Sequence, residues 1–220
     1  MSIVYLYGFA SGPQSNKAQF FKEKFSSLDV HFDIFDYIPN EESFINLKTS
    51  SLLKSLHSYL ELNYANEEII LFGSSFGALL SVWYVTKHPE RIKKLILMAP
   101  GLRFSASYIS EKHGINSSIW KKQGSINIFH YRYNREIPLN YTFYEDLVEN
   151  PPPDFDKLEI PIPILILHGN SDNVVPIAWS KQFVNHNRQV LLHVLNGNHQ
   201  LLDQKDTMWD LVKDFLNLSS

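Results

Sequence analysis

Short apolar runs and helix-like segments alternate along almost the whole chain, and this alternation restricts the fold more than any other feature. Six runs are rich in β-branched and aromatic residues: Ile3–Tyr7, Val30–Phe35, Ile69–Phe72, Leu95–Ala99, Ile162–His168 and Val190–Leu195. Segments with helical spacing separate most of these runs or follow the last one: Ser15–Leu28, Glu42–Tyr64, Phe76–Lys87, Ile177–Asn187 and Asp203–Leu218. Continuous apolar runs are typical of strands buried on both faces. The pattern therefore predicts an α/β fold, with about six mostly parallel strands and helices on both faces of the sheet.

One interval breaks this alternation. Residues 103–157 exceed an ordinary crossover in length, are rich in aromatic residues and end close to Pro151-Pro152-Pro153, a stiff and extended segment. We expect them to form a short cap insertion. With 220 residues, 44% of them hydrophobic, the chain can bury one sizeable core. We therefore expect residues 1–220 to form a single domain that contains the cap.

The composition excludes several classes of function. A net charge of −3 offers no basic face to a nucleic acid. The absence of cysteine excludes disulfides, thiolate metal sites and cysteine nucleophiles. No apolar run approaches the roughly 18 residues that cross a bilayer, and residues 1–8 lack the features of a signal peptide. We expect a cytoplasmic protein with neither a nucleic-acid nor a membrane partner, and the sequence carries no signal for an oligomeric state.

The turn Gly73-Ser74-Ser75-Phe76-Gly77 carries the strongest chemical signal in the chain. It fits the G-x-S-x-G pattern and lies between an apolar strand and an apolar helix, which is the context of a nucleophile elbow. Such a turn holds its serine in a strained conformation and needs small flanking residues. We predict that Ser75 is the nucleophile. Ser74 is the rival hydroxyl, but the second position of the elbow points away from the exposed apex.

A serine needs a base, and the base needs an orienting acid. In elbow-type hydrolases the acid and then the histidine follow the serine along the chain, on loops after later strands. Asp172 lies on the polar loop after the strand that ends at His168, and His199 lies on a glycine-containing loop after the last strand. We predict these two as acid and base. Asp172 could instead cap a turn, and Asp203 is the rival acid.

The remaining histidines have structural explanations. His88 precedes a proline and closes a helix, and His168 ends a buried strand, where we expect it to structure the acid loop. The others precede the acid or lie on surface helices and strand interiors: His31, His57, His113, His130, His186 and His193.

Acyl transfer also requires two donors to the oxyanion. The residue after the nucleophile, Phe76, supplies one backbone N–H, and Phe9 in the small-residue loop Gly8–Pro13 is predicted to supply the other. That loop matches neither of the glycine-rich patterns that bind nucleotides. The loop therefore gives no indication of a bound nucleotide.

The opening segment Tyr5–Ala18 resembles that of the small bacterial YqiA-like esterases within the α/β-hydrolase superfamily. The likeness extends to the elbow, the Asp172 loop and the His199 loop. Tyr7 stands where that family usually has a histidine. The resemblance implies an α/β-hydrolase fold and hydrolysis of short acyl or aryl esters through an acyl-enzyme, without metal or cofactor.

The residues alone support the same mechanism, in which Ser75 attacks, His199 takes and returns the proton, and Asp172 orients the imidazole. The resemblance implies that the substrate is a small-molecule ester. Two alternatives remain open: a serine peptidase or amidase on the same scaffold, and a catalytically silent hydrolase-like binding protein. A dehalogenase would need a carboxylate in place of Ser75.

Overall fold

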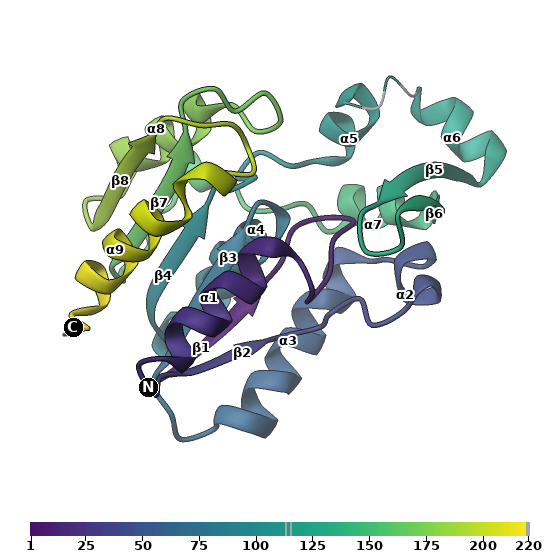
Figure 1. Ribbon diagram of the computed structural model, residues 1–220. Coiled ribbons are helices and arrows are strands. Elements are labelled where there is room, and N and C mark those ends of the chain that lie inside the picture. The colour runs from purple at the N-terminus through teal and green to yellow at the C-terminus, as the bar shows by residue number, and fades with distance from the viewer. Residues whose placement is uncertain (113, 115, 219–220) are drawn as a thin grey trace.

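The computed structural model describes residues 1–112, 114 and 116–218, so His113 lies outside the described residues. In this part of the chain six parallel strands form one sheet, in the order β2-β1-β3-β4-β7-β8 (Figure 1). Their bounds are β1 (Ser2–Leu6), β2 (His31–Ile34), β3 (Ile69–Ser74), β4 (Ile92–Met98), β7 (Ile164–Gly169) and β8 (Val190–Leu195). Each predicted strand is present, within a few residues of its predicted bounds.

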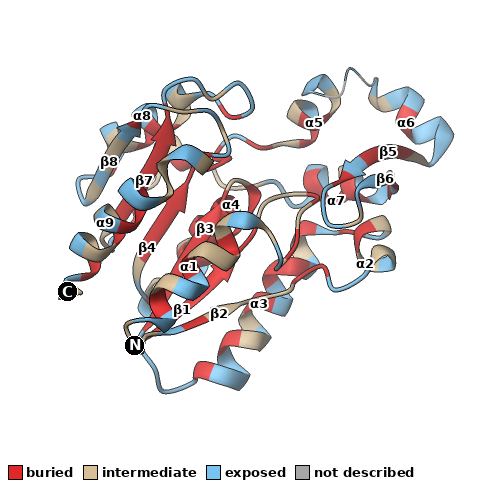
Figure 2. Cartoon of the chain, viewed as in Figure 1, coloured by how far each residue is buried: buried red, intermediate tan, exposed pale blue. Residues whose placement is uncertain are grey.

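The central strands are buried on both faces, which explains their continuous apolar runs. Every residue of β1, β3 and β7 is buried, whereas the edge strands β2 and β8 are partly exposed (Figure 2). Because all six strands are parallel, their carboxyl ends meet at one edge of the sheet.

Helices cover both faces of the sheet (Figure 1). Two of them, α1 (Asn16–Ser26) and α9 (Lys205–Leu216), contact each other on one face. Three others, α3 (Thr49–Tyr64), α4 (Phe76–Lys87) and α8 (Ile177–His186), cover the opposite face. Short 3₁₀ turns lie at η1 (Pro89–Arg91), η2 (Phe155–Lys157) and η3 (Leu202–Gln204). The prediction of an α/β fold with helices on both faces is confirmed.

The predicted helix Glu42–Tyr64 is wrong as one element, because the chain forms two helices there, α2 (Glu41–Ile45) and α3. The Asn40 side chain accepts a hydrogen bond from Ser43 N–H and caps α2. The start of α3 is capped from a distance, since the Asp146 carboxylate accepts a 2.9 Å hydrogen bond from Ser50 N–H. This separate cap stabilises a new helix start where the apolar spacing alone suggests continuity.

Residues between β4 and β7 form a small layer beyond the carboxyl end of the sheet (Figure 1). The layer contains α5 (Ala106–Lys112), α6 (Ser117–Gln123), the antiparallel pair β5 (Ser125–His130) and β6 (Arg135–Asn140), and α7 (Thr142–Glu149). Its aromatic residues divide between two roles: Trp120 and Phe143 are fully buried, whereas Phe104 and Tyr108 line a pocket.

Candidate active site

Ser75 occupies the sharp turn between β3 and α4. Its backbone has φ 55° and ψ −110°, a conformation that is strained for a residue with a side chain. Two hydrogen bonds hold the turn: Ser75 N–H donates to the Met98 carbonyl at 2.8 Å, and Leu79 N–H donates to the Ser75 carbonyl at 3.1 Å. The strand and the helix together therefore impose the turn that the sequence pattern predicts.

The two flanking glycines are sterically required. A Cβ atom added to Gly73 would overlap the backbone of Ala78, and one added to Gly77 would overlap the carbonyl groups of Leu6 and Tyr7. These backbone groups belong to the neighbouring strand and helix and cannot move aside. Glycine at both positions lets α4 start directly against β1 and β3.

Asp172 and His199 come together from two adjacent loops. Asp172 follows β7 and His199 follows β8, and His199 Nδ1 lies 2.7 Å from Asp172 Oδ2. The Asp172 side chain is fully buried, while 16% of the His199 side chain remains exposed. Asp172 Oδ1 also accepts hydrogen bonds from the N–H groups of Val174 and Val175, each at 2.8 Å. The carboxylate therefore accepts hydrogen bonds from its own loop and from the imidazole at the same time.

His168 contacts the same carboxylate from the end of β7. Its Nε2 lies 3.2 Å from Asp172 Oδ2 and 3.0 Å from the Val175 carbonyl, and its Nδ1 lies 2.8 Å from Ser180 Oγ. Burial disfavours ionisation of Asp172, but the hydrogen bonds from His168 and His199 outweigh it and hold its pKa well below the usual range. Asp172 is therefore ionised, as an acid that orients an imidazole must be.

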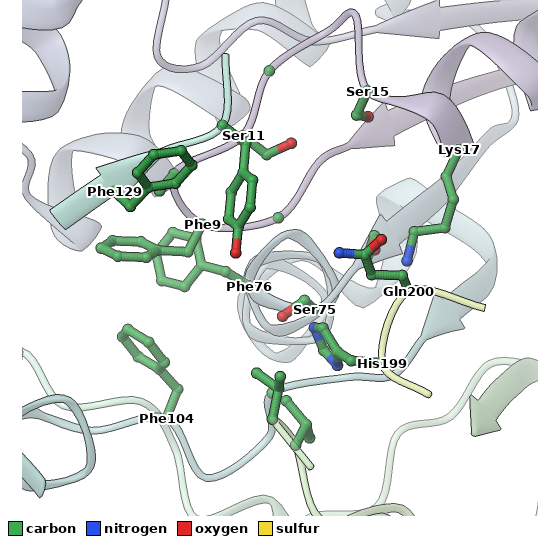
Figure 3. Close-up of a pocket in the computed structure, with 18 of the residues that line it drawn as sticks. Phe9, Ser11, Ser15, Lys17, Ser75, Phe76, Phe104, Phe129, His199 and Gln200 are labelled. Carbon is green, nitrogen blue, oxygen red and sulfur yellow. The ribbon is translucent and has the colours of Figure 1, made fainter. Parts of the chain in front are cut away.

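Ser75 and His199 line one pocket of about 940 Å³ at the carboxyl edge of the sheet. Figure 3 shows the two side chains next to each other, with the rings of Phe9, Phe76 and Phe104 on one side. His199 Nδ1 faces Asp172, which leaves Nε2 for the pocket. The structure thus brings the three residues predicted as nucleophile, acid and base to one place.

The two predicted oxyanion donors lie at the same end of the pocket. Phe76 is the first residue of α4, so its N–H has no acceptor within the helix. Phe9 N–H has no hydrogen-bond acceptor among the described residues, and both residues line the pocket. Their rings pack edge to face, with centroids 5.7 Å apart.

Tyr7 anchors the loop that carries Phe9. Its hydroxyl donates to Asp36 Oδ1 at 2.5 Å and accepts from Ile38 N–H at 3.0 Å, and its ring stacks on Tyr37. The Tyr37 hydroxyl donates back to the Tyr7 carbonyl at 2.6 Å. These contacts fix the start of the Gly8–Pro13 loop against the segment after β2.

The rival residues are less well placed. Ser74 ends β3 and is 4% exposed, whereas Ser75 is half-buried at the turn. Asp203 lies exposed in η3 and makes no hydrogen bond to His199.

One residue of the pocket lies in the opening segment Tyr5–Ala18 but has no role assigned to it from the sequence. Lys17, at the second position of α1, lines the same pocket as Ser75 and His199. Lys17 reaches the pocket only because α1 packs beside the His199 loop.

Neither a metal cluster nor a membrane-spanning helix is found within residues 1–112, 114 and 116–218. No three His, Asp or Glu side chains there are grouped as metal ligands. No helix in that part of the chain has the length and apolar character to cross a membrane.

The model of the uncharacterised protein family UPF0227 matches residues 2–217. The chain belongs to this family. This UPF0227 member is 22% identical, over 220 residues, to the protein named "Putative esterase/lipase 2" from Mycoplasma pneumoniae. The alignment covers 89% of this chain and 81% of the relative.

Two solved structures extend the comparison. Mouse alpha/beta hydrolase domain-containing protein 10 superposes with a TM-score of 0.74 at 21% identity, covering 98% of this chain and 89% of that one. Est1E from Butyrivibrio proteoclasticus, solved with ferulic acid, superposes with a TM-score of 0.77 at 17% identity, covering 98% and 88%. The predicted α/β-hydrolase fold is thus confirmed.

Proposed function

We propose that this protein is a serine carboxylesterase that cleaves short acyl or aryl esters through an acyl-enzyme. The observation that carries the proposal is the hydrogen bond between His199 Nδ1 and the buried, ionised Asp172, within a pocket that also holds Ser75 in a strained turn. The esterase/lipase name of the Mycoplasma pneumoniae relative and the hydrolase name of the mouse protein favour the same chemistry.

The first half of the reaction forms the acyl-enzyme. Ser75 Oγ attacks the ester carbonyl carbon as His199 Nε2 accepts the hydroxyl proton. The N–H groups of Phe9 and Phe76 donate hydrogen bonds to the oxygen that becomes negatively charged. The tetrahedral intermediate collapses, the bond to the alcohol oxygen breaks, and His199 returns its proton to the departing alcohol.

The second half repeats these steps with water. His199 accepts a proton from water as the water oxygen attacks the acyl carbon, and the bond to Ser75 Oγ then breaks. The acid product leaves and Ser75 regains its proton. Throughout, Asp172 keeps Nδ1 protonated, so that Nε2 is the nitrogen that accepts and donates the proton.

A paired assay tests this function against the amidase alternative. p-Nitrophenyl butanoate and a butyryl p-nitroanilide are offered to the wild-type protein and to the Ser75→Ala variant, with Ser74→Ala as the matched control. We expect ester hydrolysis by the wild type and by Ser74→Ala, and a loss of about 10⁶ in kcat for Ser75→Ala. Faster anilide than ester hydrolysis would make the protein an amidase, and activity in Ser75→Ala would remove the assigned nucleophile.

A further inference from the structure

Lys17 brings a positive charge into the pocket that holds Ser75 and His199. It belongs to the first turn of α1, and its partly buried side chain lines the pocket together with Gln200. Figure 3 shows the Lys17 side chain directed from the start of α1 toward Gln200 and the Ser75 and His199 pair.

The other cations of this region are already engaged. Arg132 pairs with Asp36 at 3.0 Å and also donates to the Ile38 carbonyl, while the Lys112 ammonium donates to the Asn173 carbonyl at 3.1 Å. The Lys17 ammonium, by contrast, has neither a carboxylate within ion-pair distance nor a hydrogen-bond acceptor among the described residues. Lys17 is therefore the pocket cation that remains available to a ligand.

The surroundings of Lys17 stabilise its charge poorly. A cation in the first turn of a helix faces the positive end of the helix dipole, and α1 has no acidic residue in that turn. Burial lowers the Lys17 pKa to about 8, although the Asp172 carboxylate opposes this shift. That carboxylate is already hydrogen-bonded to His199 and close to His168. An anion in the pocket would supply the missing counter-charge.

The two sides of the pocket differ in character (Figure 3). Phe9, Phe76 and Phe104 form an aromatic wall on one side, with ring centroids 5.0 to 6.1 Å apart. Lys17 and Gln200 lie on the other side, next to His199. This asymmetry suits a substrate with one apolar half and one charged half.

The reaction assigns each half to a side. The carbonyl oxygen accepts hydrogen bonds from the N–H groups of Phe9 and Phe76, and the acyl group takes the side of the pocket away from His199, along the aromatic wall. The alcohol must leave beside His199, because His199 Nε2 protonates it. The alcohol half therefore extends toward Gln200 and Lys17.

We propose that Lys17 determines specificity by binding an anionic group, a carboxylate or a phosphate, on the alcohol half of the ester. The inference rests on the proposed esterase function and names the substrate class of that same site. The natural substrates are then esters of hydroxy acids or of phosphorylated alcohols with an apolar acyl group.

The test compares esters that share one acyl group and differ in the charge of the alcohol. The probes are 4-carboxyphenyl butanoate, its neutral methyl ester at the carboxyl group, and 4-(butanoyloxy)phenyl phosphate. The readout is the ratio of kcat/KM for each anionic ester to that for the neutral one. In Lys17→Met we expect this ratio to fall by about tenfold or more, the effect of losing one charge-assisted hydrogen bond. The anionic group whose ratio falls more in Lys17→Met, carboxylate or phosphate, is the one that Lys17 prefers.

Matched variants separate binding from general effects. Lys22→Met removes an exposed cation from the same helix and should leave the ratio unchanged. Lys17→Arg keeps the charge, so its ratio should lie between that of the wild type and that of Lys17→Met. Phenyl hydrogen glutarate, with its charge on the acyl half, should gain no advantage from Lys17.

A pH series adds an independent readout. The groups that face Lys17 from neighbouring loops are Asp172 and His199, and their effect on catalysis is shared by the charged and neutral esters, so it cancels in the ratio. Because Lys17 loses its proton as the pH rises through about 8, the wild-type ratio should fall over that range and stay flat in Lys17→Met. A flat wild-type ratio would overturn the role of Lys17.

The outcomes distinguish the two proposals. If the wild type hydrolyses none of the esters, the proposed function fails. If it hydrolyses them but Lys17→Met leaves the ratio unchanged, or lowers all the rates equally, the esterase function stands and the role of Lys17 is rejected.

Discussion

The Nδ1 atom of His199 lies 2.7 Å from Oδ2 of Asp172, which stands 27 residues earlier in the chain. The carboxylate is fully buried and does not line the pocket, so we expect it to influence the reaction through the imidazole. This relationship determines how the Asp172 variants should behave.

Replacing Asp172 by Asn should lower kcat by about 10⁴ with little change in KM, because the amide no longer holds the imidazole in the required tautomer. Steady-state kinetics with p-nitrophenyl butanoate measures this. Asp203→Asn, the matched change at an exposed carboxylate, should keep near-normal activity. The reverse result would transfer the role of acid to Asp203.

The same carboxylate should make stability depend on pH. The pKa of Asp172 is depressed in the folded protein, so its ionised form stabilises the fold above the unfolded value of about 3.9. That contribution is lost as the pH falls toward the folded pKa. Urea unfolding measures the free energy of unfolding of the wild type and of Asp172→Asn. At pH 7 the wild type should be more stable by about 2 kcal/mol. At pH 3 this difference should be smaller. An equal gap at both pH values would argue against the depressed pKa.

The elbow should not tolerate a side chain at Gly77. Gly77→Ala places a Cβ against the carbonyl groups of Leu6 and Tyr7, so the free energy of unfolding should fall by about 3 kcal/mol. Gly101→Ala is the control, since its nearest neighbour, the Ser75 carbonyl oxygen, would lie 3.6 Å from the new Cβ. We expect a change below about 1 kcal/mol there. Similar effects of both substitutions in urea unfolding would contradict the steric account.

Acyl length should matter only up to a limit. The wall of Phe9, Phe76 and Phe104 closes one side of the pocket through packed rings. Each buried CH₂ contributes about 0.8 kcal/mol, so kcat/KM for p-nitrophenyl esters should rise at first and level off by about eight carbons. A steady rise to sixteen carbons would indicate an open groove in place of this wall.

The strands and most helices are predictable from the sequence because their apolar periodicity is local. The break between α2 and α3 is not, since the cap on Ser50 comes from Asp146, 96 residues away. The pair β5 and β6 also has a local signal in the sequence. Ile126 and Ile128 alternate with polar residues, and Asn134 occupies a turn with φ 51°.

For the site, chain order and local context were enough to single out Ser75, Asp172 and His199, because each follows a strand of one parallel sheet. Their catalytic roles, those of Phe9 and Phe76, and the role of residues 103–157 as a cap remain predictions. The place of Lys17 in the pocket could not be predicted in this way, because the likeness of Tyr5–Ala18 gives the lysine no role and a lysine at the start of a helix has no pattern that marks it as part of a pocket. Its environment exists only once α1 packs beside the His199 loop.

Labelling with a fluorophosphonate tests the central claim most directly, because the probe reacts covalently with a serine that its own pocket activates. The modified protein is digested and the labelled peptide is sequenced by mass spectrometry, in the wild type, Ser74→Ala and Ser75→Ala. We predict one adduct on Ser75 in the wild type and in Ser74→Ala, and none in Ser75→Ala. An adduct on a different residue, or no adduct on the folded wild-type protein, would contradict the assignment of Ser75 as an activated nucleophile.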